Sequence, residues 1–139
     1  MSGPPSVPGM PAPRPQRGDI YWLEMKQDQT KGSEQYGYRP WLVVSVNSIN
    51  TQLPIVVAVP LTAELHKIEN ARQFRILIPD SQKIQEPGHP KGCKGDSLAL
   101  TEQVRVLSIE RLPSQRAARL PERAMGAVEA GIAFVIDIG

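Results

Sequence analysis

The chain is poor in residues that hold metals or close disulfides. It has one cysteine, Cys93, which excludes an internal disulfide and fits a reducing compartment. Its two histidines, His66 and His89, have no carboxylate or second histidine at ligand or dyad spacing. Cys93 has a basic neighbour, Lys94, but no fixed base that would activate it. We therefore expect no metal site, no cofactor and no mechanism built on histidine.

The sequence also lacks a strong charge bias and a long apolar run. Sixteen Lys and Arg residues stand against fourteen Asp and Glu residues, and a net charge of +2 does not by itself mark a nucleic-acid-binding protein. No apolar stretch approaches the roughly 20 residues of a membrane-spanning helix, and the N-terminus has no signal-peptide pattern. We expect a cytoplasmic protein with no membrane partner, whose basic surface is local.

Prolines dominate the N-terminus. Residues 1–16 contain six prolines and almost no side chains that could anchor a core. They are expected to form a disordered tail, to which the sequence assigns no function. A chain of 139 residues suits one domain, which we place at residues 17–139.

The central part of the chain alternates short apolar segments with polar breaks. The segments are rich in β-branched and aromatic residues, which is typical of strands, and their nearly continuous apolar runs indicate burial on both faces. The predicted strands are Asp19–Met25, Trp41–Val46, Ile55–Val59, Phe74–Ile78, Ser97–Leu100 and Val104–Leu107, with the last two forming a pair bent around residues 101–103.

The C-terminal region changes its period. Pro121 suits the first turn of a helix, and apolar residues then recur at spacings of three and four. These residues are Met125, Val128, Ile132 and Val135 or Ile136. The expected fold is therefore mostly β: a small barrel of short, mainly antiparallel strands with a C-terminal amphipathic helix packed on it.

Arg39 directly follows a polar segment, Lys26 to Tyr38, that is long enough to be a functional loop. Pro40 and the buried strand after it hold the backbone of Arg39, so that its guanidinium can project. A guanidinium is a permanent cation whose fork matches phosphate oxygens. The alternative is a surface ion pair with Glu34, which composition alone favours.

Polar side chains stand at two other strand ends. The hydroxyl of Thr62 can donate to a phosphate or cap a helix that begins at Thr-Ala-Glu-Leu, and capping alone is the better supported of the two. Gln103 and Arg105 are two residues apart, which predicts that they share one face of a strand and can contact a base or a phosphate. Trp22 and Trp41 can stack on bases, but aromatic residues in apolar strands usually belong to the core.

Four blocks of sequence follow one another along the chain: Arg17-Gly-Asp-Ile-Tyr-Trp22, Lys31-Gly-Ser-Glu-Gln-Tyr-Gly-Tyr-Arg-Pro40, Pro60-Leu-Thr62 and Leu98-Ala-Leu-Thr-Glu-Gln-Val-Arg105. Each is modestly specific, but the ordered set, from about Arg17 to the C-terminus, resembles the MazF/PemK toxins of bacterial toxin–antitoxin pairs. The resemblance implies an SH3-like barrel, a homodimer, and an endoribonuclease that cleaves single-stranded RNA at short sequence motifs. It also implies a cognate antitoxin whose flexible segment occupies the RNA groove, with DNA bound only through that antitoxin.

The resemblance also implies roles for individual residues. The expected catalytic residues are Arg39, Thr62 and Glu34, and the expected RNA-binding residues are Gln35, Tyr38, Gln103 and Arg105. Some members of the family carry a histidine within or near the first loop. Here the residue before Arg39 is Tyr38, so a histidine-assisted mechanism is not supported.

In the implied reaction, a ribose 2'-hydroxyl attacks the neighbouring phosphorus and gives a 2',3'-cyclic phosphate and a free 5'-hydroxyl without a metal. The step needs a base near the 2'-oxygen, an acid near the leaving 5'-oxygen and positive charge on the phosphorane. Arg39 suits the last task and can donate to the leaving oxygen, but a pKa above roughly 12 makes it a poor base. Glu34 can be the base if its surroundings raise its pKa from the usual ~4.3 toward neutrality.

The strongest alternative is a CcdB-like toxin that binds DNA gyrase, because a fold does not fix a function. Such toxins resemble the same barrel and place a tryptophan near the C-terminus, whereas this chain has none beyond Trp41. A third interpretation is a barrel that binds RNA or a partner without cleaving. The presence of both Arg39 and Thr62 argues against it.

Overall fold

The computed structural model describes residues 14–26 and 37–138. Its strands are β1 (Asp19–Met25), β2 (Gly37–Val43), β3 (Ile55–Thr62), β4 (Arg75–Ile78), β5 (Ile84–Gln85), β6 (Ser97–Leu100), β7 (Arg105–Ser108) and β8 (Ala118–Arg119). Its α-helices are α1 (Asn47–Gln52) and α2 (Gly126–Val135). Five 3-10 turns complete it: η2 (Leu65–Ile68), η3 (Asp80–Gln82), η4 (Thr101–Gln103), η5 (Ile109–Arg111) and η6 (Glu122–Ala124).

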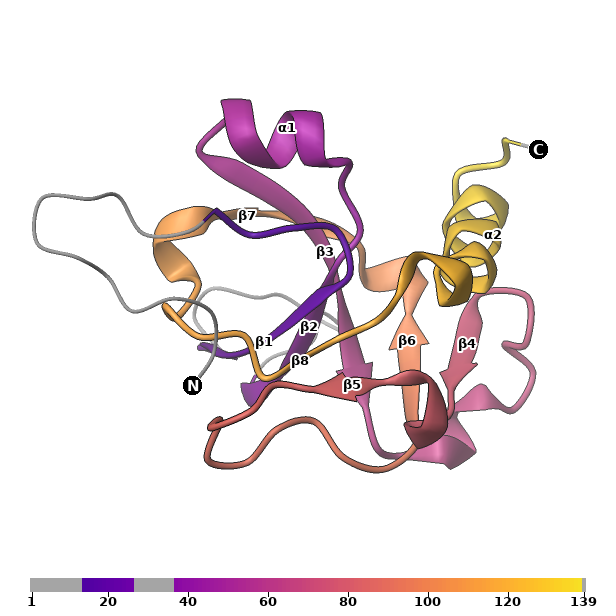
Figure 1. The fold of residues 1–139 in the computed structure, drawn as a ribbon. Helices are drawn as coiled ribbons and strands as arrows, with labels where there is room; N and C mark the ends of the chain where they lie inside the picture. The colour runs from indigo at the N-terminus through magenta and orange to yellow at the C-terminus, as the bar shows by residue number, and fades with distance from the viewer. Residues whose placement is uncertain (1–13, 27–36, 139) are drawn as a thin grey trace, which may run out of the picture.

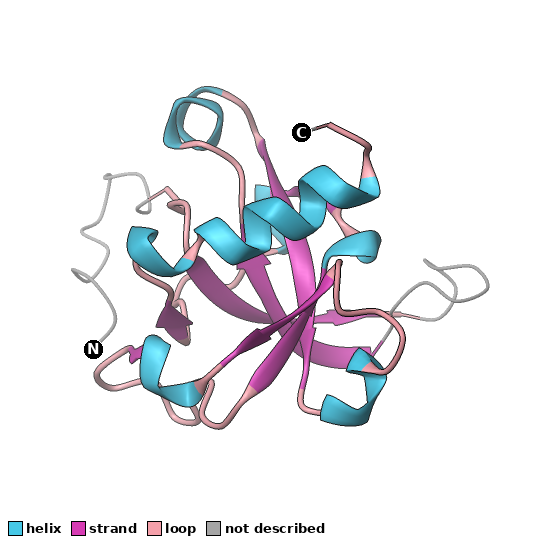
Figure 2. Ribbon diagram, turned by 90° about the vertical axis from the view of Figure 1, so that its right-hand side faces the viewer, coloured by secondary structure: helices cyan, strands magenta, loops and turns pink. Residues whose placement is uncertain are grey.

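The strands form one curled antiparallel sheet, which confirms the expected fold class (Figure 1). Its order is β4-β6-β3-β2-β1-β8-β5, and β7 also pairs with β3. Helix α2 crosses one face of the strands (Figure 2). The sheet is thus a half-barrel that the C-terminal helix covers.

Alternating side chains of the central strands reach two cores, one on each face, as predicted for strands buried on both sides. Ile20, Leu42 and Val59 belong to the first core, which α2 closes with Met125 and Val128. The second core is smaller. It consists of Tyr21, Leu23, Met25, Trp41, Val43, Val56, Ala58 and Leu107, with Ile109 and Leu112 packed against it.

Two predicted strand ends next to a proline were wrong, because the strands continue through Pro40 and Pro60. Strand β3 continues through Pro60 to Thr62 because it changes partner there: Ile55–Ala58 pair with β7, and Leu61 and Thr62 pair with β6. β6 and β7 therefore pair with β3 and not with each other. Strand β2 begins at Gly37 instead of Trp41, because residues 37–40 pair with β1. Helix α1 and the two-residue strands β5 and β8 were not predicted.

The C-terminal helix starts later than predicted. Pro121 precedes the 3-10 turn η6, and α2 itself begins at Gly126. Met125 and Val128 are fully buried and Ile132 is packed against the first core, which confirms the predicted packing face. The end of the apolar stripe is exposed, however, with Ile136 at 53%.

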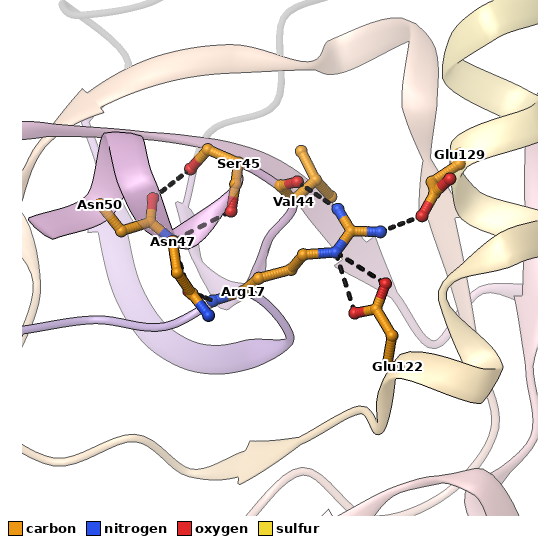
Figure 3. A network of polar contacts seen from close by, with 7 residues as sticks. All are labelled: Arg17, Val44, Ser45, Asn47, Asn50, Glu122 and Glu129. Atoms are coloured by element: carbon orange, nitrogen blue, oxygen red, sulfur yellow. Dashed lines mark hydrogen bonds and ion pairs between the residues drawn. The ribbon is translucent and has the colours of Figure 1, made fainter.

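Arg17 ties the start of the domain to α2 (Figure 3). Its guanidinium donates to the carbonyl oxygen of Val44 at 2.5 Å and to Glu122 at 3.0 Å, and it contacts Glu129 of the helix. Its backbone N–H donates to Oδ1 of Asn47 at 2.8 Å. The first residue of the expected domain is therefore a structural clamp.

Three residues that were expected to belong to the tail contact the fold. Pro15 is buried, the Arg14 guanidinium donates to the carbonyl oxygen of Asn50 at 2.9 Å, and Gln16 donates its N–H to Asp19 at 2.8 Å. Residues 1–13 lie outside the described part of the chain. Across residues 14–26 and 37–138, no helix is long and apolar enough to cross a membrane.

Candidate active site

Arg39 lies inside strand β2, not at the end of a loop as the sequence suggested. It pairs with Leu23 of β1, which holds its backbone on one side. Alternation along β2 places the Arg39 side chain on the same face as Trp41 and Val43, at the border of the second core. Its side chain is neither buried nor fully exposed. The sheet, more than Pro40, therefore positions this guanidinium.

Thr62 is the last residue of β3 and is 6% exposed. The β2–β3 register pairs Trp41 with Pro60, and continuing it by two residues places Arg39 opposite Thr62. The Thr62 hydroxyl accepts the backbone N–H of Glu64 at 3.2 Å and lies 3.5 Å from Oε2 of Glu64. The prediction of a helix cap at Thr62 is wrong, because η2 begins only at Leu65.

Glu64 is the third member of the site, and sequence reasoning assigned it no role. Its carboxylate is near both the Thr62 hydroxyl and the charge of Arg39, and it forms an ion pair with Lys67 at 2.9 Å. The motif Thr-Ala-Glu-Leu predicts a helix start, but its two-residue spacing instead places the Glu64 carboxylate beside the Thr62 hydroxyl.

The surroundings lower the pKa values of both Arg39 and Glu64, for different reasons. Burial lowers the pKa of Arg39 from its usual value, and attraction by Glu64 only partly opposes this effect. The hydrogen bond from Lys67, together with its charge, lowers the pKa of the exposed Glu64 carboxyl. Glu64 therefore stays ionised near neutral pH and is unsuited to accept a proton there. Arg39 remains a cation, because the ordinary pKa of a guanidinium lies far above neutral pH.

Arg105 shares this face of the sheet. It pairs with Ala58, cross-strand partners share a face, and alternation along β3 puts Thr62 on that face too. Gln103 lies in the turn η4, before β7 begins. The prediction that Gln103 and Arg105 share one face of a strand is therefore wrong.

Tyr38 lies on the opposite face of β2 from Arg39. Its ring stacks on Trp22, with centroids 5.0 Å apart, and it is 58% exposed. Trp41, by contrast, is 1% exposed and belongs to the core as predicted. The structure thus separates Tyr38 from the Arg39 side chain, although the two are adjacent in sequence. Glu34 and Gln35 lie outside the described residues.

Neither the Cys93 thiol nor a cluster of metal ligands offers another reactive centre in the described residues. Burial raises the pKa of the Cys93 thiol above its usual value, so it is not an activated nucleophile. In the described part of the chain, no three His, Cys, Asp or Glu side chains gather as a metal site would require. The groups brought together are thus a guanidinium, a hydroxyl and an ionised carboxylate, of which the first two are suited to hold a phosphate.

The chain is similar to MazF proteins in fold and to an endoribonuclease in sequence. MazF from Deinococcus radiodurans superposes with a TM-score of 0.65 at 22% identity, over 90% of this chain and 98% of that one. A MazE–MazF complex from the same organism gives 0.62 at 19% identity, with coverage of 90% and 98%. Endoribonuclease EndoA from Bacillus subtilis is 28% identical over 113 residues, which cover 81% of this chain and 86% of the relative.

The family model that matches residues 16–136 describes the PemK-like, MazF-like toxins of type II toxin–antitoxin systems. The matched range includes both cores, the Arg39–Thr62 pair and helix α2. The match does not favour the gyrase-directed alternative. The chain therefore belongs to the PemK-like, MazF-like toxin family of type II toxin–antitoxin systems.

Proposed function

We propose that this protein is an endoribonuclease toxin that cleaves single-stranded RNA at short motifs, by attack of a ribose 2'-hydroxyl and without a metal. Family membership supports a toxin, and the similarity to Endoribonuclease EndoA supports RNA cleavage. The observation that carries the chemistry is the convergence of Arg39, Thr62 and Glu64 at the ends of β2 and β3. Together these three side chains form a site for one phosphate.

In this mechanism the 2'-oxygen forms a bond to phosphorus and its proton passes to a base. Arg39 stabilises the negative charge that grows on the phosphorane, and the Thr62 hydroxyl donates to a non-bridging oxygen. The bond from phosphorus to the 5'-oxygen then breaks. Arg39 transfers a proton to that leaving oxygen, which becomes the 5'-hydroxyl, and the guanidine regains a proton from water. Glu64 orients Arg39 and Thr62 without taking a proton. The products are a 2',3'-cyclic phosphate and a 5'-hydroxyl.

Glu34 remains our proposal for the base. It precedes β2 by only a few residues, so the chain can carry it to the phosphate site. The variant Glu34→Gln should cleave RNA at least about 100-fold more slowly, in line with the usual contribution of a general base. Cleavage at the wild-type rate would place the base elsewhere.

The decisive experiment incubates the purified protein with a long RNA in EDTA and maps the chemistry of both new ends, with Arg39→Ala as the control. We expect cyclic phosphate and 5'-hydroxyl ends from the wild type and almost none from the variant. A requirement for Mg²⁺, or cleavage that survives the loss of Arg39, would contradict the mechanism. Uncut RNA together with inhibited gyrase would support the CcdB-like alternative.

Gln35, Gln103 and Arg105 are proposed to contact RNA on either side of the cut. Arg105 has the best structural support, because it shares the face of Arg39 and Thr62.

We also propose a cognate antitoxin. Its flexible segment competes with RNA for this face, and the toxin contacts DNA only through it. A synthetic antitoxin C-terminal segment should therefore inhibit cleavage competitively with RNA. Non-competitive inhibition would place the antitoxin elsewhere.

A homodimer is proposed from an exposed apolar face beside α2. Val46, Val106, Phe134, Ile136 and Ile138 are each 51–62% exposed. Three of them, Val46, Ile136 and Ile138, line a mostly apolar groove of about 340 Å³ together with Val57 of β3 and Ile132 of α2. Clustered exposure of this kind is uncommon on monomers and typical of interfaces.

Sedimentation velocity tests the dimer. Val106→Glu should shift the protein toward monomer, while Leu77→Glu, at a 45% exposed apolar position on β4, should not. A dimer that survives Val106→Glu unchanged would place the interface elsewhere.

A further inference from the structure

A cation and two aromatic rings form a stacking cluster on the face of β2 opposite to Arg39: Trp22, Tyr38 and Lys91. The Trp22 and Tyr38 rings are 5.0 Å apart with their planes at 29°. Nζ of Lys91 lies 3.7 Å from the Trp22 centroid and 5.0 Å from the Tyr38 centroid. These distances form a triangle, so the ammonium lies beside the two rings and does not extend their stack.

Tyr38 leaves most of its ring available. It is 58% exposed, and Trp22 covers only one of its two faces. The open face of an exposed aromatic ring is a platform for a nucleobase, and a neighbouring cation adds attraction for the phosphate that follows.

The fold holds Lys91 in place through its neighbours. Nδ1 of His89 accepts the backbone N–H of Lys91 at 3.1 Å and of Gly92 at 2.8 Å, and Nε1 of Trp22 donates to the Gly92 carbonyl oxygen at 2.7 Å. Gly92 has a φ of +62°, and a Cβ there would lie 2.5 Å from Oε1 of Gln85. The backbone beside Lys91 is therefore fixed against Trp22, and the cluster is built by the fold.

A groove of about 740 Å³ adjoins the two rings. Trp22 and Tyr38 line it together with the cations Lys26 and Arg111 and the carboxylates Glu24 and Glu110. Lys91 does not line the groove itself but lies against the Trp22 ring, where it adds a cation at the groove's edge for the phosphate of a bound nucleotide.

We propose that the stacking cluster binds a nucleotide of single-stranded RNA outside the reacting pair, with the base on Tyr38 and a phosphate at Lys91. The inference rests on the proposed function. Tyr38 and Arg39 are consecutive residues whose side chains leave β2 on opposite faces. A bound strand reaches both only by passing around β2, so the cluster contributes to affinity and not to the chemical step.

The test measures binding of a 12-nucleotide 2'-O-methyl RNA of mixed sequence, which has no free 2'-hydroxyl and is not cleaved. Tyr38→Leu should raise its Kd about 10-fold, because stacking on one aromatic ring is lost. Tyr38→Phe should restore most of the affinity. Lys91→Gln should reduce the slope of log K against log salt by about 0.7, one phosphate contact, while Lys94→Gln nearby should leave the slope nearly unchanged.

Two further readouts make the outcome specific. RNA should quench the tryptophan fluorescence of the wild type, and Tyr38→Leu should raise KM for a cleavable RNA by far more than it changes kcat. A Kd within twofold of wild type for Tyr38→Leu, or an unchanged salt slope for Lys91→Gln, would overturn the inference. Loss of affinity for the antitoxin with unchanged RNA binding would overturn it too and assign the cluster to a protein partner. Failure of the wild type to cleave RNA would instead refute the proposed function, because the binding measurement needs no cleavage.

Discussion

Arg39 and Arg116 are both partly buried, but their surroundings are opposite. Arg116 donates to Asp19 at 2.9 Å and to Glu86 at 2.5 Å, two carboxylates that are themselves buried. Burial opposes the charge of Arg116, yet its hydrogen bonds to Glu86 and Asp19 outweigh burial and raise its pKa. At Arg39 burial outweighs the attraction of Glu64 and lowers the pKa.

This difference distinguishes the structural role of Arg116 from the catalytic role that we propose for Arg39. The ion pairs of Arg116 join the start of β1 to the segments before β8 and after β5. The carboxylates of Asp19 and Glu86 thus balance the charge of Arg116. At Arg39 the charge of Glu64 does not offset the effect of burial on the pKa. In the proposed function, the phosphate and the phosphorane formed from it add negative charge beside this guanidinium.

The largest expected effect is on stability, at Arg116. Arg116→Met leaves Asp19 and Glu86 buried without their cation and should lower the free energy of unfolding by about 3–5 kcal/mol. Urea titration measures this value, and Arg72→Met, at an exposed arginine, is the control with an expected change below about 0.5 kcal/mol. Equal stability of the two variants would remove the contrast between Arg116 and Arg39.

At Arg39 the expected effect is on catalysis even when the charge is kept. Arg39→Lys retains a cation but loses the planar fork, and we expect kcat to fall about 100-fold. Single-turnover rates at saturating RNA measure this directly. A lysine variant with nearly full activity would mean that charge alone is sufficient.

Thr62 should show a smaller change, divided between activity and stability. Thr62→Val keeps the shape but removes the hydroxyl that accepts the Glu64 N–H. We expect kcat to fall about 10-fold and stability to fall by about 1 kcal/mol. If stability falls while kcat is unchanged, Thr62 only orders the turn at the end of β3.

The smallest effect on kcat is expected at Glu64, and the pH dependence of kcat tests its role. Its lowered pKa keeps it ionised as pH falls to its ordinary value near 4.5, so it does not titrate between pH 5 and 8. Glu64→Gln should therefore reduce kcat a few-fold and leave the shape of the pH profile intact in that window. Loss of an acidic limb in the variant would identify Glu64, and not Glu34, as the base.

Sequence patterns predicted the parts of this molecule that depend on local periodicity. Strands β1 and β6 have the predicted bounds, and the apolar spacing of Met125 and Val128 identified the packing face of α2. The faces of the site depend on long-range register, which local patterns do not contain. Gln103 therefore lies in a turn and not on the predicted strand, and the Tyr38 ring stacks on Trp22, away from the Arg39 side chain.

Arg116 shows the same limit for electrostatics. Its role depends on partners that the sheet brings close, such as Glu86, thirty positions away in sequence. Glu64 has local partners in Thr62 and Lys67, and only its effect on Arg39 depends on the sheet. Arg39 and Thr62 were found because they belong to ordered sequence blocks. Their opposition across β2 and β3 became clear only from the register.

The most direct test of the account is the single-turnover rate of RNA cleavage by Arg39→Met in EDTA, with urea stability measured on the same preparation. We predict a rate at least about 1,000-fold below wild type, because cation and fork are both lost, together with unchanged or increased stability. Cleavage within tenfold of wild type, or a loss of activity that only follows unfolding, would contradict the central role of Arg39.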